Sequence, residues 1–159
     1  MTRQESADNR EPLPFDSYPF LGRNLFLRVR GYGGSRLGYA LRHMQHTGQT
    51  SCSFCGLDLT STYENWLTIS LDHVVPANIC RLLGICDEWT DDHSNRVLCC
   101  AACNAFKNKW TPEVPPECPT TLDEFFNMRD AMFIERRSHV RQRHIDERRS
   151  FDSKPWDKK

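Results

Sequence analysis

The chain has 159 residues, with 21 basic and 21 acidic side chains and a formal net charge of zero. This length predicts one domain with tails, and the sequence holds no apolar run long enough to span a membrane. The polar N-terminus lacks the apolar stretch of a secretory signal, so we expect a cytoplasmic protein and no disulfide framework.

The two ends of the chain differ in composition from its middle. Residues 1–22 are polar and rich in proline, which predicts a loosely draped arm, and residues 150–159 predict a loose tail. The stretch between them, residues 23–149, is expected to form a single domain whose core covers residues 50–110. The start of this domain, residues 23–30, fits a short strand or a short helix equally well.

A basic helix is predicted before the first cysteine pair. Apolar side chains follow a helical spacing from residue 36 to residue 47, and Gly48 ends the segment. No acidic residue occurs between residues 17 and 57, so Arg36 and Arg42 are candidate contacts for phosphate groups. Ordinary solvated charge explains the same pattern equally well.

Four of the eight cysteines form two C-x-x-C pairs, Cys52 with Cys55 and Cys100 with Cys103. Each pair can present two thiolates from one tight turn to a single tetrahedral ion. In a chain without a secretory signal, this arrangement predicts a structural Zn²⁺ site. The alternative is a set of buried thiols that share no ligand.

Two strands and a helix are predicted between the cysteine pairs and just after them. Residues 66–75 and 96–99 have the composition of strands, and a short helical turn is expected at residues 79–83. A helix over residues 101–110 would begin inside the second cysteine pair.

A long helix is predicted after a proline-rich connector. Thr121 and Glu124 form a capping-box sequence, which starts a helix that we expect to reach about residue 149. Four arginines on this helix can contact phosphates, although helix solubility explains them equally well; they are Arg136, Arg137, Arg141 and Arg143. The candidate core contacts are Leu122, Phe125, Phe126, Met132, Phe133 and Val140.

Four segments stand out together: CSFCG, LDHVVP, SNRVLCCAACN and NAFKN. Their joint spacing resembles the HNH endonuclease family. The resemblance covers residues 50–110 and implies an α+β fold, in which a small zinc-stabilised ββα-metal core is flanked by an N-terminal helix and a long C-terminal helix. The linker after LDHVVP reads ANICRLLGICDEWTDDHS, whereas many relatives have a glycine- and arginine-rich linker, so a differently shaped substrate groove is expected.

The resemblance implies roles for four residues. His73 is the general base, because an imidazole with a pKa of roughly 6.5 accepts protons near neutral pH. Asp72 and Asn104 are ligands of a catalytic Mg²⁺ or Mn²⁺, since both offer hard oxygen donors. Asn95 ties the loop to the strand by backbone hydrogen bonds and helps to orient His73. Separately, Lys107 is a candidate phosphate contact, although a plain surface lysine explains it equally well.

The resulting hypothesis is a metal-dependent endonuclease that hydrolyses phosphodiester bonds of DNA, with double-stranded DNA as the expected partner. Two alternatives stay open at this point. One is a zinc-stabilised nucleic-acid-binding module without turnover. The other is an RNA-directed nuclease, because basic flanks do not separate RNA from DNA. The sequence does not decide between a monomer and a homodimer.

Overall fold

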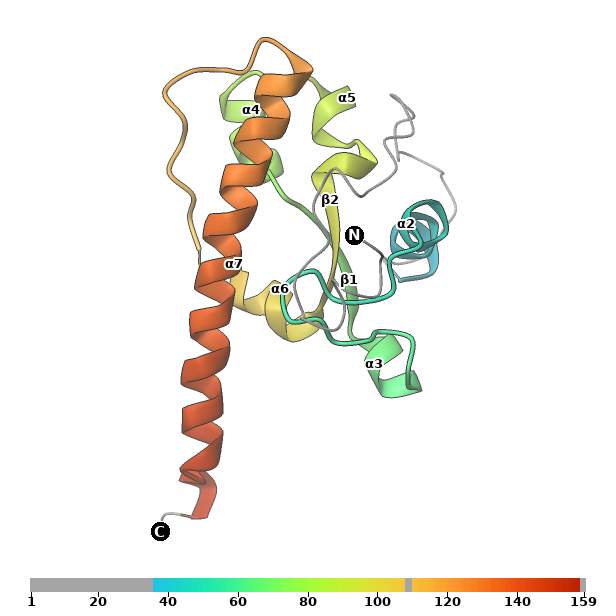
Figure 1. The fold of residues 1–159 in the computed structure, drawn as a ribbon, viewed down its shortest axis with the longest axis vertical. Coiled ribbons are helices and arrows are strands. Elements are labelled where there is room, and N and C mark those ends of the chain that lie inside the picture. Colours follow the sequence, from blue (N-terminus) through green and yellow to red (C-terminus); the bar gives the residue numbers. More distant parts are fainter. Residues whose placement is uncertain (1–35, 108–109, 158–159) are drawn as a thin grey trace, which may run out of the picture.

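The computed structural model describes residues 36–107 and 110–157, so the predicted arm and the segment 23–30 lie outside the described residues. An antiparallel two-stranded sheet lies at the centre of the molecule (Figure 1). It pairs β1 (Ile69–His73) with β2 (Arg96–Cys100). With the helices around it, the fold is α+β, as expected.

The register of the sheet separates the two residues of the Asp-His pair. His73 lies opposite Arg96, and Asp72 lies opposite Val97. Because successive side chains of a strand point to opposite faces, His73 and Asp72 lie on different faces of the sheet. Figure 1 shows α7 on one side of the sheet and α2 on the other.

The predicted basic helix is confirmed, although its first turns are wider than those of an α-helix. The π-helix η2 (Arg36–Ala40) leads directly into α2 (Leu41–Thr47), and η2 packs against β1. Gly48 ends α2 with a φ of 64° and donates a backbone hydrogen bond to the carbonyl of Met44. A side chain at this position would be strained, which is why the helix stops at a glycine.

The prediction of a strand over residues 66–75 is wrong at both ends. The chain forms α3 (Tyr63–Leu67) first, and β1 begins only at Ile69 and ends at His73. Thr62 caps α3, because its hydroxyl accepts a hydrogen bond from the backbone N of Asn65 at 3.1 Å. The capped helix therefore forms here, although Trp66 within it has a high propensity for strands.

Short helices connect the two strands and follow the second one. The segment between the strands forms α4 (Ala77–Leu82), α5 (Asp87–Thr90) and the 3₁₀ turn η3 (His93–Asn95). The predicted helical turn at residues 79–83 therefore falls in α4, except that Leu83 is the residue that caps its C-terminus. After β2 comes α6 (Ala101–Lys107), which packs against both strands; of the helix predicted over residues 101–110, Trp110 is not helical.

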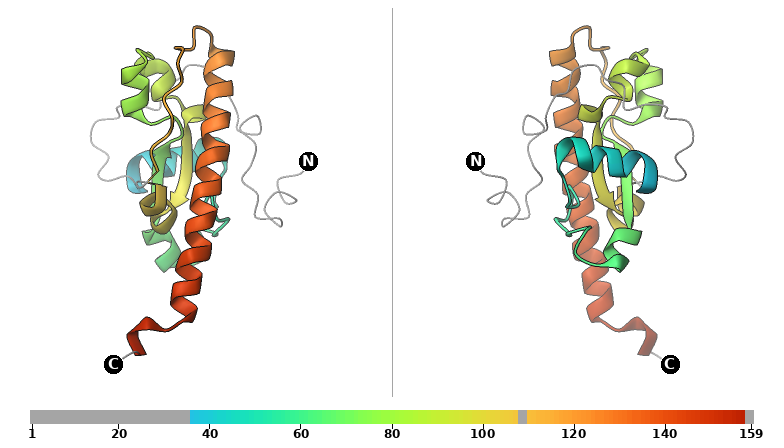
Figure 2. Two further views of the ribbon diagram at one scale, coloured as in Figure 1. Left: turned by 90° about the vertical axis from the view of Figure 1, so that its left-hand side faces the viewer. Right: turned by 90° about the vertical axis from the view of Figure 1, so that its right-hand side faces the viewer.

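The long C-terminal helix is confirmed as α7 (Leu122–Asp152). Its capping box is complete: the Thr121 hydroxyl accepts from the backbone N of Glu124, and the Glu124 carboxylate accepts from the backbone N of Thr121. The predicted loose tail is wrong in part, because α7 runs three residues past residue 149 and the turn η4 (Pro155–Asp157) follows. Figure 2 shows the last turns of α7 projecting beyond the rest of the molecule.

α7 contributes to two apolar clusters. Phe125 and Met132 pack in a cluster with residues of α4, whereas Phe133 and Val140 pack in a second cluster with the sheet and the first cysteine turn. Of the six predicted core contacts, these four are buried, and Leu122 and Phe126 are half-buried beside the first cluster. Among the described residues, no helix is both long and apolar enough to cross a membrane.

Candidate metal centre and active site

The four paired cysteines form one cluster. The sulfurs of Cys52, Cys55, Cys100 and Cys103 all lie within 4.8 Å of one another, and the Sγ atoms of Cys55 and Cys100 are 3.9 Å apart. A tetrahedral Zn²⁺ with bonds of about 2.3 Å places its sulfurs roughly 3.8 Å apart, whereas a disulfide needs about 2.05 Å. The cluster therefore fits a metal such as zinc, and the eight cysteines are all free thiols.

Local backbone geometry places the two cysteine pairs. In the first pair, Gly56 donates a backbone hydrogen bond to the Cys52 carbonyl at 2.9 Å and adopts a φ of 73°. In the second pair, Cys100 ends β2 and Cys103 lies on α6, and the Cys103 backbone N is 3.5 Å from the Cys100 sulfur. The cluster therefore joins the first turn to the junction of strand and helix.

The thiols influence one another strongly. Hydrogen bonding from Cys103 is the largest effect that lowers the pKa of Cys100, and the same contact raises the pKa of Cys103. A divalent cation would favour the thiolate form of all four groups, since the thiolate is the ligand that binds metal. His144 of α7 adds an outer contact, with its Nε2 atom 3.0 Å from the sulfur of Cys103. This contact could not be predicted from local sequence patterns, because 41 positions separate the two residues.

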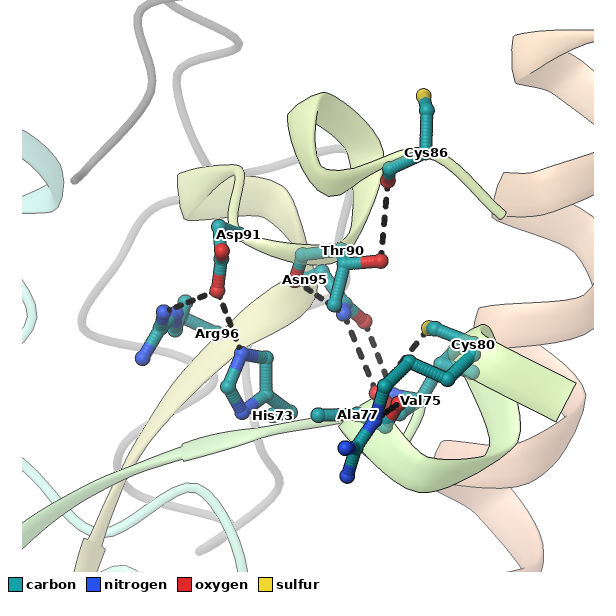
Figure 3. Close-up of polar contacts among 10 residues, drawn as sticks. His73, Val75, Ala77, Cys80, Cys86, Thr90, Asp91, Asn95 and Arg96 are labelled. Atoms are coloured by element: carbon teal, nitrogen blue, oxygen red, sulfur yellow. Dashed lines mark hydrogen bonds and ion pairs between the residues drawn. The ribbon is translucent and has the colours of Figure 1, made fainter. Parts of the chain in front are cut away.

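His73 lies at the end of β1 in contact with a carboxylate. Its Nε2 atom is 3.0 Å from Oδ1 of Asp91, and Nη2 of Arg96 is 2.8 Å from the same oxygen (Figure 3). Burial lowers the pKa of His73 below its ordinary value of 6.5, and the charge of Arg96 lowers it further against the opposing effect of Asp91. His73 is therefore neutral near pH 7. Sequence reasoning missed both Asp91 and Arg96.

Asn95 ties the end of β1 to the α5 loop. Its Oδ1 atom accepts from the backbone N of Val75 at 2.9 Å, and its Nδ2 atom donates to the carbonyls of Val75 at 3.2 Å and Thr90 at 2.8 Å (Figure 3). The side chain is fully buried. These are backbone hydrogen bonds of the kind that the sequence predicted for this residue.

Asp72 contacts an arginine of α7 on the opposite face of the sheet. Its Oδ2 atom is 3.3 Å from Nη1 of Arg136, which also donates to the His73 carbonyl at 2.9 Å. The Arg136 guanidinium lies over the rings of Trp110 and Phe54, at 5.4 Å and 5.9 Å from their centroids. Because Arg136 is fully buried, the expectation that it contacts phosphates is wrong.

The remaining predicted residues lie on the surrounding helices. Asn104 is half-buried on α6, directly after Cys103, and Arg42 is half-buried on α2. The side chains of Arg36 and Lys107, at the start of η2 and the end of α6, are outside what the structure describes. The structure therefore brings Asp72, His73 and Asn95 to one end of the sheet and places Asn104 on the helix that packs against it.

No protein-family model, no curated protein and no solved structure matches this chain.

Proposed function

We propose that the protein is a metal-dependent endonuclease of the HNH type that hydrolyses DNA, with His73 as its general base. The observation that carries this proposal is the state of His73. Its Nε2 atom is hydrogen-bonded to the Asp91 carboxylate, whereas its Nδ1 atom has no hydrogen-bond partner among the described residues. The side chain keeps 21% of its surface exposed, so water can reach a neutral imidazole with one available lone pair.

The surrounding chain supports this role. Water gives its proton to Nδ1 of His73 as its oxygen bonds to phosphorus, and the bond between phosphorus and the leaving sugar oxygen breaks. The leaving oxygen takes up a proton from solvent, and the Asp91 carboxylate stabilises the imidazolium that results. Asn95 holds the backbone after His73, which limits movement of the ring relative to the sheet. The cysteine cluster fixes the other end of the same sheet to α6, which carries Asn104.

Asp72 and Asn104 are the residues that would hold Mg²⁺ or Mn²⁺. They offer a carboxylate and an amide oxygen, the donors that these ions prefer, from elements that pack against each other. A bound ion would supply charge stabilisation at the phosphate and at the leaving oxygen. The cysteine cluster, with sulfur donors only, suits zinc and a structural role.

One observation favours a second function, a zinc-stabilised nucleic-acid-binding module without turnover. The carboxylate of Asp72 is paired with Arg136, a buried cation whose side chain is only 1% exposed. An ammonium or guanidinium group competes with a metal ion for the same carboxylate oxygen. If Arg136 holds Asp72 permanently, the catalytic ion loses one of its two protein ligands.

Cleavage of supercoiled plasmid by the zinc-loaded protein tests the two functions against each other. With Mg²⁺ or Mn²⁺ we expect nicked or linear DNA, no product from His73→Ala, and unchanged cleavage by His139→Ala, which removes a half-buried histidine of α7. Zinc content and circular dichroism should be the same in all three proteins.

Two results would decide against the nuclease. Cleavage by His73→Ala at the wild-type rate would remove the proposed base. DNA binding in a gel-shift assay, without product under any of the metals, would establish the binding module instead. A single-stranded RNA of matched length, assayed in parallel, separates the DNA-directed from the RNA-directed activity.

A further inference from the structure

The carboxylate of Asp91 and the guanidinium of Arg96 lie next to the His73 ring (Figure 3). One oxygen atom, Oδ1 of Asp91, contacts both Nε2 of His73 at 3.0 Å and Nη2 of Arg96 at 2.8 Å. A guanidinium group has only donors, so the oxygen that faces Arg96 acts as an acceptor. The same oxygen meets the imidazole, and the hydrogen of that contact must therefore come from Nε2.

We propose that Asp91 is a positioning residue that fixes His73 in the tautomer with hydrogen on Nε2 and leaves Nδ1 as the proton acceptor. Arg96 holds the Asp91 carboxylate in place for this purpose. The catalytic part of this inference rests on the proposed nuclease function, whereas the tautomer itself does not.

The three residues come from three different elements, and each element is fixed independently. His73 ends β1 and Arg96 begins β2, and the two lie opposite each other in the strand pairing. Asp91 follows α5, and its backbone N donates to the carbonyl of Asp87 at 2.9 Å. The contact is therefore built into the fold and does not depend on one flexible side chain.

Partial burial makes the arrangement specific. The side chains of His73, Asp91 and Arg96 are 21%, 20% and 11% exposed, so water competes less for their hydrogen bonds than at an open surface. Thr90, the residue before Asp91, is also held in place, because its carbonyl accepts a hydrogen bond from Nδ2 of Asn95. Asn95 thus connects the backbone on both sides of the contact, after His73 and before Asp91.

A purely structural role for Asp91 would be to join the α5 loop to β2 through Arg96. Two substitutions of Asp91 separate this structural role from the proposed role of fixing the His73 tautomer. Asp91→Asn keeps an oxygen that can accept from both Arg96 and His73, whereas Asp91→Leu removes every acceptor at a similar volume. Asp130→Leu is the matched control, because it breaks an aspartate–arginine pair on α7, that of Asp130 with the buried Arg129.

Nitrogen-15 NMR of the zinc-loaded full chain reads the tautomer directly, at a pH where the imidazole is neutral. In the wild type we expect a downfield, exchange-protected proton bonded to Nε2 of His73, assigned by its loss in His73→Ala. The signal should persist in Asp91→Asn and in Asp130→Leu and disappear in Asp91→Leu. The wild-type spectrum alone tests the assignment if a variant does not fold.

Cleavage kinetics test the catalytic consequence. Asp91→Leu should lower kcat by about 100-fold, the lower end of what a general base contributes, with little change in KM, and Asp91→Asn should restore most of the rate. Hydrogen on Nδ1 in the wild type, or an unchanged Nε2 signal in Asp91→Leu, would overturn the proposal. If the expected spectra are found but the wild type never cleaves, the nuclease function fails while the tautomer assignment holds.

Discussion

Replacing Arg136 by methionine probes the contact that fastens α7 to β1. The Arg136 side chain is 1% exposed and donates both to the Asp72 carboxylate and to the His73 carbonyl. Methionine keeps an unbranched apolar stem that can rest against Trp110 and Phe54, and it removes the guanidinium. The substitution therefore removes the polar contacts with little change in volume.

The expected loss follows from opposing contributions. A charged hydrogen bond such as the one to the His73 carbonyl contributes about 1.5 to 3 kcal/mol. At 3.3 Å, with an effective dielectric constant of about 20, the ion pair gains roughly 5 kcal/mol, much of which desolvation cancels. Nε and Nη2 of Arg136 are buried and have no hydrogen-bond partner among the described residues. Removing these two atoms removes their desolvation penalty, which offsets part of the loss in stability. Because Arg136→Met also takes this buried guanidinium away from the Asp72 carboxylate, we expect a net loss of about 3 kcal/mol.

Urea unfolding of the zinc-saturated protein, followed by circular dichroism, measures this loss. With a slope of about 2 kcal/mol per M, the midpoint should fall by roughly 1.5 M at an unchanged slope. A cycle with Asp72→Asn should give a coupling free energy of about 1 to 2 kcal/mol. The control Arg148→Met breaks a pair whose arginine is 75% exposed, and it should cost under about 0.5 kcal/mol. A loss below about 1 kcal/mol with no coupling would show that the polar contacts of Arg136 do not stabilise the fold, and would leave ring packing as the reason for its burial.

Three further predictions concern the scaffold. Chelation of zinc, or Cys103→Ser, should abolish the cooperative thermal transition, because a metal bound to the cysteine cluster would supply stability that a small core lacks; an unchanged transition on calorimetry would count against a metal site. His144→Phe should keep the packing on Phe106 but weaken zinc binding by about 10-fold in a chelator competition, since it removes the contact with the Cys103 sulfur; equal affinity would show that this contact is incidental. Asn95→Ala should cost about 3 kcal/mol in urea unfolding, because three buried hydrogen bonds are lost, and Asn65→Ala on the exposed α3 side should cost clearly less; comparable losses would contradict the role given to Asn95.

Features that depend on a few neighbouring residues were predictable from the sequence. The C-x-x-C turns, the Thr121 capping box and the glycine after α2 each act within about four positions, so their patterns are visible in the chain. The capping signal at Thr62 is equally local, and attention to it would have found α3. The apolar residues Trp66 and Leu67 concealed it, because they suit a strand as well as a helix.

Contacts between distant positions were not predictable from one sequence. In the sequence, Asp91 is one of several acids between the two strands, and Arg136 is one of several arginines on the C-terminal helix. Which member of such a set is buried depends on the tertiary register: Arg136 meets Asp72 across 64 positions, and Asp91 meets His73 across 18. The candidate base and metal ligands, and Asn95 beside them, were visible in the sequence, whereas the contacts of Asp91 and Arg136 with them were not.

The cysteine cluster also has a topological consequence. The segment between Cys55 and Cys100 carries β1, Asp91 and Asn95, so an ion bound to both cysteine pairs would close this segment into a ring. Closing a loop of this size, 45 positions between the two cysteines, removes chain entropy worth about 4 kcal/mol if the ion acts like a covalent crosslink. A protease nick at the exposed Gly84, inside the ring, should therefore leave two fragments that stay associated until a chelator separates them.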